Sequence, residues 1–483
     1  MASATAVEPR RRMLIFINIV ITCIASSMLS TALTTALPPI MADLHLDAVT
    51  GQWLTSGYSL AMGIMMPLTA FLITRFPTRK LYLTALGVFI AGSLLCVVAP
   101  GFEIMMVGRV LQALGGGALT SMAQVIVLSI FPAEERGTAM GWYGLSVGAA
   151  PVVAPTLAGV LVDTLGWRWI FYLAIAIMVA SLLFALRVFG NVLETHEKRF
   201  DVLSFVLSIF AFGGVTLGIG NVSSEGLGSM QTLVPLVVGL VAAVAFSVRQ
   251  FKLSEPFLDL RILCQRDYAL SVIGSMLLYL VMMGSSVIMP LYVQNIVGAS
   301  ATVSGLVTLP GSLAMAIVSP FAGRIYDALG MKKLFVAGAA LMLASNLGMT
   351  TLTLQTSVWV ASALNAVRCV AIGCLMMPLV TWGTSRIGLT KTADGTALLT
   401  SLRTIAGAVG SAVFVGVMTS VAAGMTGAGT SGAGVAAETA AAEASMHGLT
   451  VAFWAMSGVT AVLLFVAVFM VRSKRVPHTE AEA

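Results

Sequence analysis

The chain has little charge: only 10% of its 483 residues are Asp, Glu, Lys or Arg, whereas 58% are hydrophobic and the mean hydropathy is +0.98. A soluble domain of this size could not bury so much apolar surface, which excludes an ordinary soluble protein. About fourteen apolar runs each provide the roughly 20 residues that a membrane-spanning helix requires. These runs are residues 13–37, 53–73, 80–99, 103–130, 138–162, 168–189, 202–221, 232–250, 268–291, 303–324, 333–353, 357–382, 396–424 and 447–471.

Positive charge is missing from every second connection between these runs. All seven lysines and fifteen of the nineteen arginines fall in the other connections and in the two end segments. Loops rich in Lys and Arg stay on the cytoplasmic side, so both ends are expected inside and the number of spans is even. The sequence therefore predicts an all-α membrane protein with 14 transmembrane helices. The connections without Lys or Arg lie near residues 38–52, 99–102, 221–231, 293–303, 354–357 and 425–446.

The signatures of several enzyme classes are also absent. The chain has no nucleotide-binding loop, no His-Glu-x-x-His and no Gly-x-Ser-x-Gly at a strand–helix turn, which argues against an ATP-driven pump and against an enzyme. Its five cysteines show no metal-ligand spacing, so neither a metal nor another cofactor is expected. The net charge of +6 follows from the inward bias of Lys and Arg and requires no nucleic-acid partner.

An internal repeat divides the chain into two similar halves. Two prolines and a small residue recur in the second half as Pro290, Pro320 and Gly323, after Pro38, Pro67 and Ala70 in the first. The separations along the chain are 29 and 3 residues in the first half and 30 and 3 in the second. Parallel halves packed around a cavity at mid-membrane depth are the architecture of rocking transporters. We expect a cytoplasmic leader (1–12), an N-terminal six-helix bundle (13–200), two inserted helices (201–251), a surface-lying cytoplasmic linker (252–267), a C-terminal six-helix bundle (268–471) and a cytoplasmic tail (472–483).

One arginine lies inside a glycine-rich predicted span, within residues 108–117. A buried Arg in a membrane helix is costly and usually paired, so Arg109 is a candidate functional residue, and Gln112 lies one turn along the same face. The neighbouring glycines would let another helix approach closely. A purely structural role, in which the guanidinium caps backbone carbonyls, remains open.

Two basic turns follow the repeated prolines. The first carries Arg75 and Arg79, and the second contains Gly323, Arg324, Asp327, Gly330 and Lys332. An acid at a helix end that pairs with a base or a facing helix N-terminus in one conformation only would act as a latch. We expect Asp327, with Arg324 or Lys332, to form such a latch, while simple anchoring of the bases at the membrane interface is the alternative.

These patterns resemble the major facilitator superfamily, specifically its fourteen-helix drug–proton antiporter branch. The second basic turn is similar to the family's cytoplasmic gate motif, Gly-x-x-x-Asp-Arg-x-Gly-Arg-Lys, whereas the first turn has Thr74 at the Asp position. Residues 150–159 resemble the helix 5 antiporter motif Gly-Pro-x-x-Gly-Gly, which the family associates with export. By this resemblance Pro151, Pro155 and Gly159 would shape a helix 5 pivot.

A carboxylate that many relatives carry in helix 1 is replaced here by Leu29. We expect no acid near the membrane midplane, since Glu103, Asp163 and Asp201 fall at span ends and the remaining acids in loops or tails. A cavity with arginines and no carboxylate should disfavour doubly cationic drugs and admit neutral or anionic amphiphiles. Proton coupling would then use another acid such as Asp327, use a proton carried by the substrate, or be absent.

The candidate cavity residues are Arg109, Gln112, Tyr58, Thr34, Asn365, Arg368 and Arg403. The resemblance implies a secondary active transporter that exports amphipathic small molecules by alternating access, coupled to the proton gradient. We expect it to work as a monomer in a bacterial cell membrane. A dedicated carrier for one metabolite or lipid precursor, and a non-transporting membrane sensor on the same fold, are the alternatives.

Overall fold

The computed structural model describes residues 8–46, 48–193, 195, 201–226, 228–253, 256–299, 301–388, 391–426 and 435–471. Some helical residues within these ranges, including Thr34, Pro151 and Pro155, are described by their backbone only. The described chain is helical throughout, without a strand. The predicted all-α class is therefore confirmed for this part of the chain.

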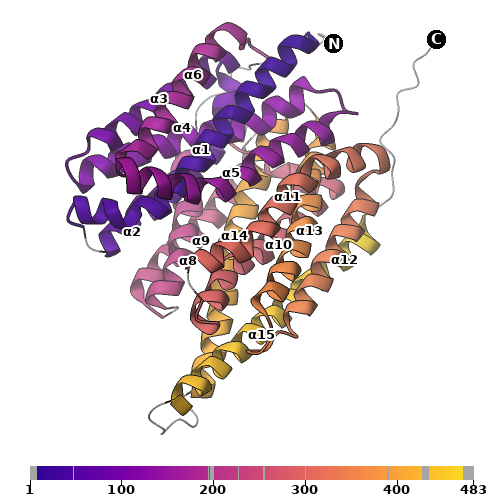
Figure 1. Cartoon of the computed structure of the whole chain (residues 1–483). Helices are drawn as coiled ribbons and strands as arrows, with labels where there is room; N and C mark the ends of the chain where they lie inside the picture. Colours follow the sequence, from indigo (N-terminus) through magenta and orange to yellow (C-terminus); the bar gives the residue numbers. More distant parts are fainter. Residues whose placement is uncertain are drawn as a thin grey trace. The chain divides into compact units, whose positions relative to one another are not determined.

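Six long helices form the first half of the chain (Figure 1). They are α1 (Pro9–Asp43), α2 (Ala48–Arg75), α3 (Thr78–Val98), α4 (Phe102–Ile130), α5 (Arg136–Leu165) and α6 (Arg168–Val188). Six more form the last part: α10 (Arg266–Leu291), α11 (Ala301–Leu329), α12 (Met331–Met349), α13 (Val358–Ser385), α14 (Thr392–Thr426) and α15 (Val435–Phe465). Single π-helical turns extend α10 (η3, Tyr292–Ile296) and α15 (η5, Val466–Met470).

Shorter elements lie between these two sets. One apolar run is built from α7 (Val202–Ser208), the π-helical turn η1 (Ile209–Gly213) and α8 (Gly214–Glu225), and it is followed by α9 (Met230–Lys252). A 3₁₀ turn, η2 (Leu260–Cys264), precedes α10. All fourteen predicted apolar runs therefore coincide with helical segments.

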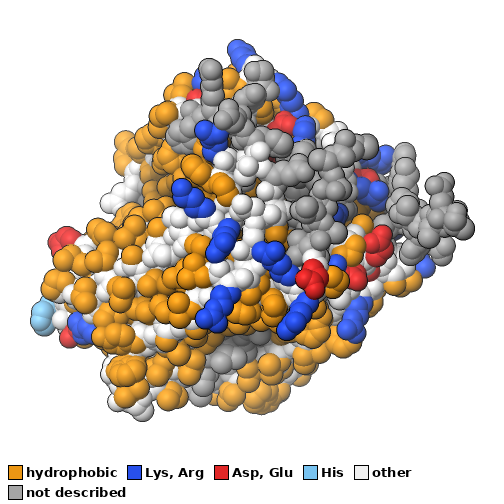
Figure 2. Space-filling view, turned by 90° about the horizontal axis from the view of Figure 1, so that it is seen from above, with side chains coloured by type: hydrophobic (Ala, Val, Ile, Leu, Met, Phe, Trp, Pro, Cys, Tyr) orange, Lys and Arg blue, Asp and Glu red, His pale blue; other side chains and the backbone are white. Residues whose placement is uncertain are grey.

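Twelve of the helical segments in the described ranges are long and apolar enough to cross a membrane. The long helices α5 and α12 are not among them. In α12, which has only 19 residues, Lys332 and Lys333 occupy the first turn and lower the mean hydropathy. Figure 2 shows Lys and Arg side chains among hydrophobic ones on the face in view.

Two expectations about the connections were wrong. The linker was expected to lie on the surface, but the side chains of residues 256–260 are buried, because Phe257 stacks on Phe71 with ring centroids 5.9 Å apart. The connection expected at 425–446 becomes helical at Val435, since the Ala- and Glu-rich stretch that follows favours a helix. Residues 427–434 and the predicted tail, 472–483, lie outside the described chain.

The structure divides into two units. The N-terminal unit comprises Met1–Leu217, Pro235–Leu263 and Ile387–Ser401, and the C-terminal unit comprises Gly218–Val234, Cys264–Arg386 and Leu402–Ala483. In the N-terminal unit, α4 packs on α1, α2 and α3, and α6 packs on α1 and α3 (Figure 1). In the C-terminal unit, α13 packs on α10, α11 and α12, and α15 packs on α10 and α12. These helix pairs of the N-terminal unit thus have counterparts in the C-terminal unit, in the same chain order.

Glycines of α4 and of α3 allow close packing between these two helices. A Cβ atom added at Gly115 would lie 2.7 Å from the carbonyl oxygen of Ala85, and one added at Gly92 would lie 2.6 Å from the backbone nitrogen of Gln112. Both distances are too short for any side chain, so α3 and α4 touch backbone to backbone. This contact holds Arg109 and Gln112 at a fixed depth against α3.

Candidate functional site

Arg109 is the centre of a polar cluster in the N-terminal unit. Its side chain is 1% exposed, and its Nε donates a hydrogen bond of 3.1 Å to the carbonyl oxygen of Leu54 on α2. The guanidinium carbon also lies 4.1 Å from the ring centroid of Tyr58, one turn further along α2. A cation over an aromatic face is attracted by the ring quadrupole, more strongly when water is excluded. Arg109 therefore fastens α4 to α2 through a backbone carbonyl and an aromatic ring.

Gln112 extends this cluster to a third helix. Its Oε1 accepts a hydrogen bond of 2.6 Å from Nη1 of Arg109, and its Nε2 donates one of 2.9 Å to Oγ of Ser93 on α3. The Ser93 hydroxyl in turn donates to the Phe89 carbonyl at 2.9 Å. The chain of hydrogen bonds runs from α2 through α4 to α3. Sequence analysis missed Ser93, whose small polar side chain in an apolar helix was the only available signal.

The C-terminal unit contains a matching pair on α13. Nη2 of Arg368 donates a hydrogen bond of 2.5 Å to Oδ1 of Asn365, one turn earlier in the same helix. The Arg368 side chain is 1% exposed, and its guanidinium carbon lies 5.7 Å from the ring centroid of Phe453 on α15. Both buried arginines thus pair with an amide side chain three residues away and lie near an aromatic ring of a neighbouring helix.

Arg403 is the third buried arginine. It lies on α14, is 5% exposed, and its guanidinium carbon lies 4.8 Å from the ring centroid of Tyr279 on α10. No carboxylate pairs with Arg109, Arg368 or Arg403 among the ion pairs of the described residues. The three arginines named from the sequence are therefore buried beside aromatic rings, and Arg109 and Arg368 also bind an amide side chain.

The three arginines differ in how far their donors are satisfied. Nε and Nη1 of Arg109 both have acceptors, whereas Nε and Nη1 of Arg368 and of Arg403 are buried without one. A buried polar group without a partner costs about 1–3 kcal/mol, and more when it is charged. The C-terminal unit therefore contains four unsatisfied donors on two cations.

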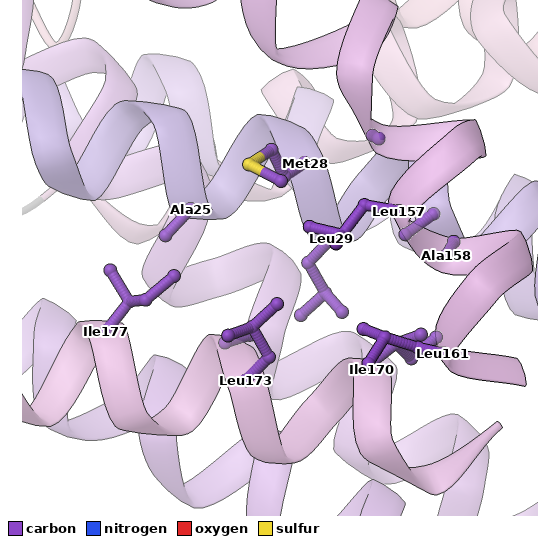
Figure 3. Close-up of a pocket in the computed structure, with 12 residues that line it drawn as sticks. Ala25, Met28, Leu29, Leu157, Ala158, Leu161, Ile170, Leu173 and Ile177 are labelled. Carbon is purple, nitrogen blue, oxygen red and sulfur yellow. The ribbon is translucent and has the colours of Figure 1, made fainter. Parts of the chain in front are cut away.

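Leu29 lies where the family resemblance placed a carboxylate, and its surroundings are apolar. A cavity of about 30 Å³ is lined by side chains of α1, α5 and α6 (Figure 3). Such a volume holds one or two water molecules but no drug-sized compound. Its lining side chains are Ala25, Met28, Leu29, Ala32, Ala154, Leu157, Ala158, Leu161, Ile170, Leu173, Ala174 and Ile177. Because none of them is polar, this cavity offers no hydrogen-bond partner to an acid.

In the first basic turn, between α2 and α3, Arg79 caps the end of α6. Nη2 of Arg79 donates a hydrogen bond of 2.7 Å to the carbonyl oxygen of Leu186, near the end of α6. The Thr74 hydroxyl, at the family's Asp position, donates to the Phe71 carbonyl of its own helix at 2.8 Å. Arg75 is exposed in the last turn of α2. The structure thus ties Arg79 to α6, with Thr74 bonded inside α2.

The second turn, between α11 and α12, keeps the Gly, Asp, Gly and Lys of the family motif and has Ala328 and Met331 at its two Arg positions. Gly330 has a φ of +75°, a left-handed conformation that glycine adopts without strain, and it lets α12 start directly after α11. Gly323 is buried, Asp327 and Lys332 are half-buried, and Arg324 is exposed. The four residues lie within three turns of the α11–α12 corner, where the sequence placed them.

The helix 5 motif lies in the middle of α5. Pro151 and Pro155 belong to this helix, but their side chains are outside the described part, as is that of Thr34 in α1. A Cβ atom added at Gly159 would meet no atom within 4 Å. Ala154 and Ala158, which replace family glycines, are both 1% exposed and line the apolar cavity. Their methyl groups fill space between α5 and α1.

The position of Asp394 differs from the prediction. Asp394 was expected in a loop, but it lies in the first turn of α14 and is 8% exposed. The helix begins at Thr392, four residues earlier than predicted, because the Thr-Ala-Asp-Gly stretch gave no apolar signal. An acid in the first helical turn is favoured by the helix dipole.

Ion pairs outside the spans join helix ends within each unit. Asp43, at the end of α1, accepts hydrogen bonds from Arg168 at 2.8 Å and from the Trp167 indole at 3.1 Å, and these bonds hold its pKa below the usual value. Asp201 caps α7 and binds Arg249 through both carboxylate oxygens, each at 3.0 Å. Burial would raise the pKa of Asp201, but hydrogen bonds from Arg249 and Ser204 lower it to about 2. These contacts fix the ends of α1 and α6 and of α7 and α9.

Comparison with known proteins places this arrangement in a family. The profile of the Major Facilitator Superfamily matches residues 15–411. An uncharacterized MFS-type transporter of Bacillus subtilis, YcnB, is 35% identical over 94% of this chain and 93% of its own. The lincomycin resistance protein LmrB of the same organism is 32% identical over 99% of both chains. The multidrug export protein EmrB of Haemophilus influenzae is 27% identical over 80% of this chain and 76% of its own.

A solved structure has the same fold. The crystal structure of the human organic anion transporter MFSD10 superposes with a TM-score of 0.66 at 14% sequence identity, covering 95% of this chain and 100% of that one. At this identity the likeness shows the fold alone. With the family profile and the bacterial relatives, it identifies the chain as a member of the major facilitator superfamily, a multi-pass membrane transporter related to the LmrB and EmrB multidrug efflux proteins.

Proposed function

We propose that this protein is a secondary active exporter of amphipathic small molecules in the bacterial cell membrane. The observation that carries the proposal is the match along 99% of both chains to LmrB, a lincomycin resistance protein. EmrB, a multidrug export protein, supports the outward direction of transport. The identity of 32% supports the class of activity more than any particular compound.

The topology that goes with this proposal is fourteen spans with both ends cytoplasmic. Twelve spans qualify by length and hydropathy. Helices α5 and α12 complete the count of fourteen, because they coincide with the apolar runs expected at 138–162 and 333–353. The distribution of Lys and Arg between alternate connections supports this orientation. In this topology α7 to α9 are the two inserted spans between the six-helix bundles.

Alternating access would rock the two bundles around a central substrate site. The corner at Gly330, with Arg324, Asp327 and Lys332 close by, would form the cytoplasmic latch, while Pro151, Pro155 and Gly159 would shape the bending part of α5. The Arg109–Gln112 cluster would hold α2, α3 and α4 as one body during this movement. Export would be driven by the proton gradient through an acid other than one at position 29, since Leu29 has no titratable group.

The test is proton release from inverted membrane vesicles that hold a preset pH gradient. Vesicles with the protein should lose the gradient when lincomycin or another transported amphiphile is added, whereas vesicles without it should not. An Arg109→Ala variant, checked for folding by size-exclusion chromatography, should be inactive. Saturable export without any change in the gradient would remove proton coupling from the proposal, and export of a single compound from a broad panel would indicate a dedicated carrier.

A further inference from the structure

The C-terminal unit buries two cations whose hydrogen-bonding capacity is unused. Nη2 of Arg368 donates a hydrogen bond to Asn365, whereas its Nε and Nη1 have no acceptor. Arg403 contacts the Tyr279 ring, and its Nε and Nη1 likewise have no acceptor. In the N-terminal unit, by contrast, the same two nitrogens of Arg109 bind Leu54 and Gln112. The two units therefore differ: both of these nitrogens have acceptors on Arg109, and neither has one on Arg368 or Arg403.

We propose that Arg368 and Arg403 bind the oxyanion group of a transported substrate, such as a carboxylate, sulfonate or phosphate. A guanidinium presents its N–H donors in a planar fork that matches such groups, and hydrogen bonds between charged partners are about twice as strong as neutral ones. The proposal rests on the proposed export function and names the substrate class. It gives the carrier a preference for anionic amphiphiles over neutral and cationic ones.

The two arginines lie in the same unit of the structure. Arg368 lies on α13 and Arg403 on α14, and both helices pack against α10. A Cβ atom added at Gly410 would lie 2.0 Å from the Leu280 carbonyl oxygen, so α14 approaches α10 backbone to backbone. Tyr279, the neighbour of Arg403, lies on this same helix α10. Aromatic rings at Tyr279 and Phe453 would contact the apolar body of the ligand while the guanidinium groups bind its charge.

The distribution of ion pairs also supports an anionic ligand. Within the described chain, the acids that form ion pairs do so at helix ends and in the linker, with Arg12, Arg168, Arg249, Arg386 and Lys391. None of these pairs neutralises the charge of Arg368 or Arg403. A dication in the same place would face two like charges with no counter-ion, whereas an anion would supply the missing acceptors.

The test uses three probes with one aromatic body and different charge: 2-naphthoate, 2-naphthylmethanol and 2-naphthylmethyl-trimethylammonium. Equilibrium dialysis against the purified full-length protein should show 2-naphthoate binding at least about tenfold more tightly than the alcohol. Arg368→Gln and Arg403→Gln should each weaken 2-naphthoate binding by roughly tenfold and leave binding of the alcohol unchanged. Arg187→Gln, which removes an exposed arginine of α6, is the matched control and should bind all three probes like the wild type.

Thermal stability without ligand gives a second readout that separates ligand binding from folding. Removing a buried charge that has two donors without acceptors should raise the unfolding temperature of Arg368→Gln and Arg403→Gln. Arg109→Gln should lower it, because the acceptors Leu54 and Gln112 lose their donor. Equal affinity for the three probes, or 2-naphthoate binding that survives both substitutions, would overturn the anion site. A lower unfolding temperature for both C-terminal variants would also overturn it, since the arginines would then be structural.

Transport of the same probes into inverted vesicles distinguishes this proposal from the export function. Arginine-dependent binding of 2-naphthoate without transport of any probe would support the anion site and count against export. Transport of the alcohol or the ammonium compound, with no transport or binding of 2-naphthoate, would support export and overturn the anion site.

Discussion

Arg109 donates a hydrogen bond of 2.6 Å to Gln112, one turn further along α4. On α13, the fourth helix of the second half, Arg368 binds Asn365 with the order of base and amide reversed along the chain. In the first half the Gln112 amide also donates a hydrogen bond to Ser93, and the Arg109 guanidinium donates one to the Leu54 carbonyl oxygen. In the second half the guanidinium retains unsatisfied donors. Each half thus buries an arginine that binds an amide side chain of its own helix. Only the arginine of the first half has acceptors for both its Nε and its Nη1.

The first prediction concerns this network. Gln112→Leu should destabilise the protein by about 2 kcal/mol, because Nη1 of Arg109 loses its acceptor inside the bundle. Unfolding in detergent, followed by the loss of the monodisperse peak on heating, measures the change. Gln124→Leu is the matched control on the same helix: its Oε1 is already without a partner, so the loss should be smaller. Equal losses would show that the Arg109–Gln112 bond contributes little.

The second prediction concerns the missing helix 1 acid. Leu29→Asp should destabilise the protein by several kcal/mol, because Leu29 is 3% exposed and lines a cavity without a polar side chain. Leu29→Met keeps an apolar side chain of similar volume and should cost less than about 1.5 kcal/mol. Thermal unfolding of both variants gives the comparison. An Asp variant as stable as the Met variant would mean that water or a donor reaches this cavity.

The third prediction concerns the linker. Phe257 is 1% exposed and lies between Phe71 and Phe205, with ring centroids 5.9 and 6.3 Å away. Phe257→Ala should cost about 3 kcal/mol and release the segment that carries Arg261. The rate of tryptic cleavage after Arg261 should therefore rise. Phe251→Ala changes a side chain that is 50% exposed and leaves its carbonyl in place for Arg261, so cleavage should stay slow.

The fourth prediction is a pH dependence at Asp201. Its pKa in the folded protein is about 2, below the roughly 3.9 of an unfolded chain, so its ion pair with Arg249 stabilises the folded state above about pH 4. This contribution is lost as the pH falls from about 4 to about 2, when the folded carboxylate also becomes protonated. The wild type should therefore unfold at a higher temperature than Asp201→Asn at about pH 7.

The difference between wild type and Asp201→Asn should shrink at about pH 3. Arg249→Gln should reduce this pH-dependent part without removing it, because Ser204 also lowers the pKa of Asp201. A difference that is independent of pH would show that the ionised form of Asp201 adds no stability to that of the neutral carboxyl group.

The helical class, the fourteen apolar runs and the family were readable from the residues themselves. Continuous hydrophobic runs in a membrane leave a helix as the only way to satisfy every backbone group, so composition and run length decided the class. The glycines of α4 predicted a close helix contact, because two backbones can touch only where a side chain is missing. Gly115 makes such a contact with the backbone of Ala85. Arg109, Arg368 and Arg403 stood out because a charge in an apolar run is rare.

The tertiary structure decided which partners these groups have. Leu54, Ser93, Phe453 and Tyr279 lie on other helices than the groups they contact, and nothing in a linear pattern sets the rotation of one helix against another. The burial of Phe257 and the start of α15 at Val435 depended likewise on packing and on helix propensity in stretches without an apolar signal. Sequence alone named the three buried arginines, and only the packing of the helices showed that one is satisfied and two are not.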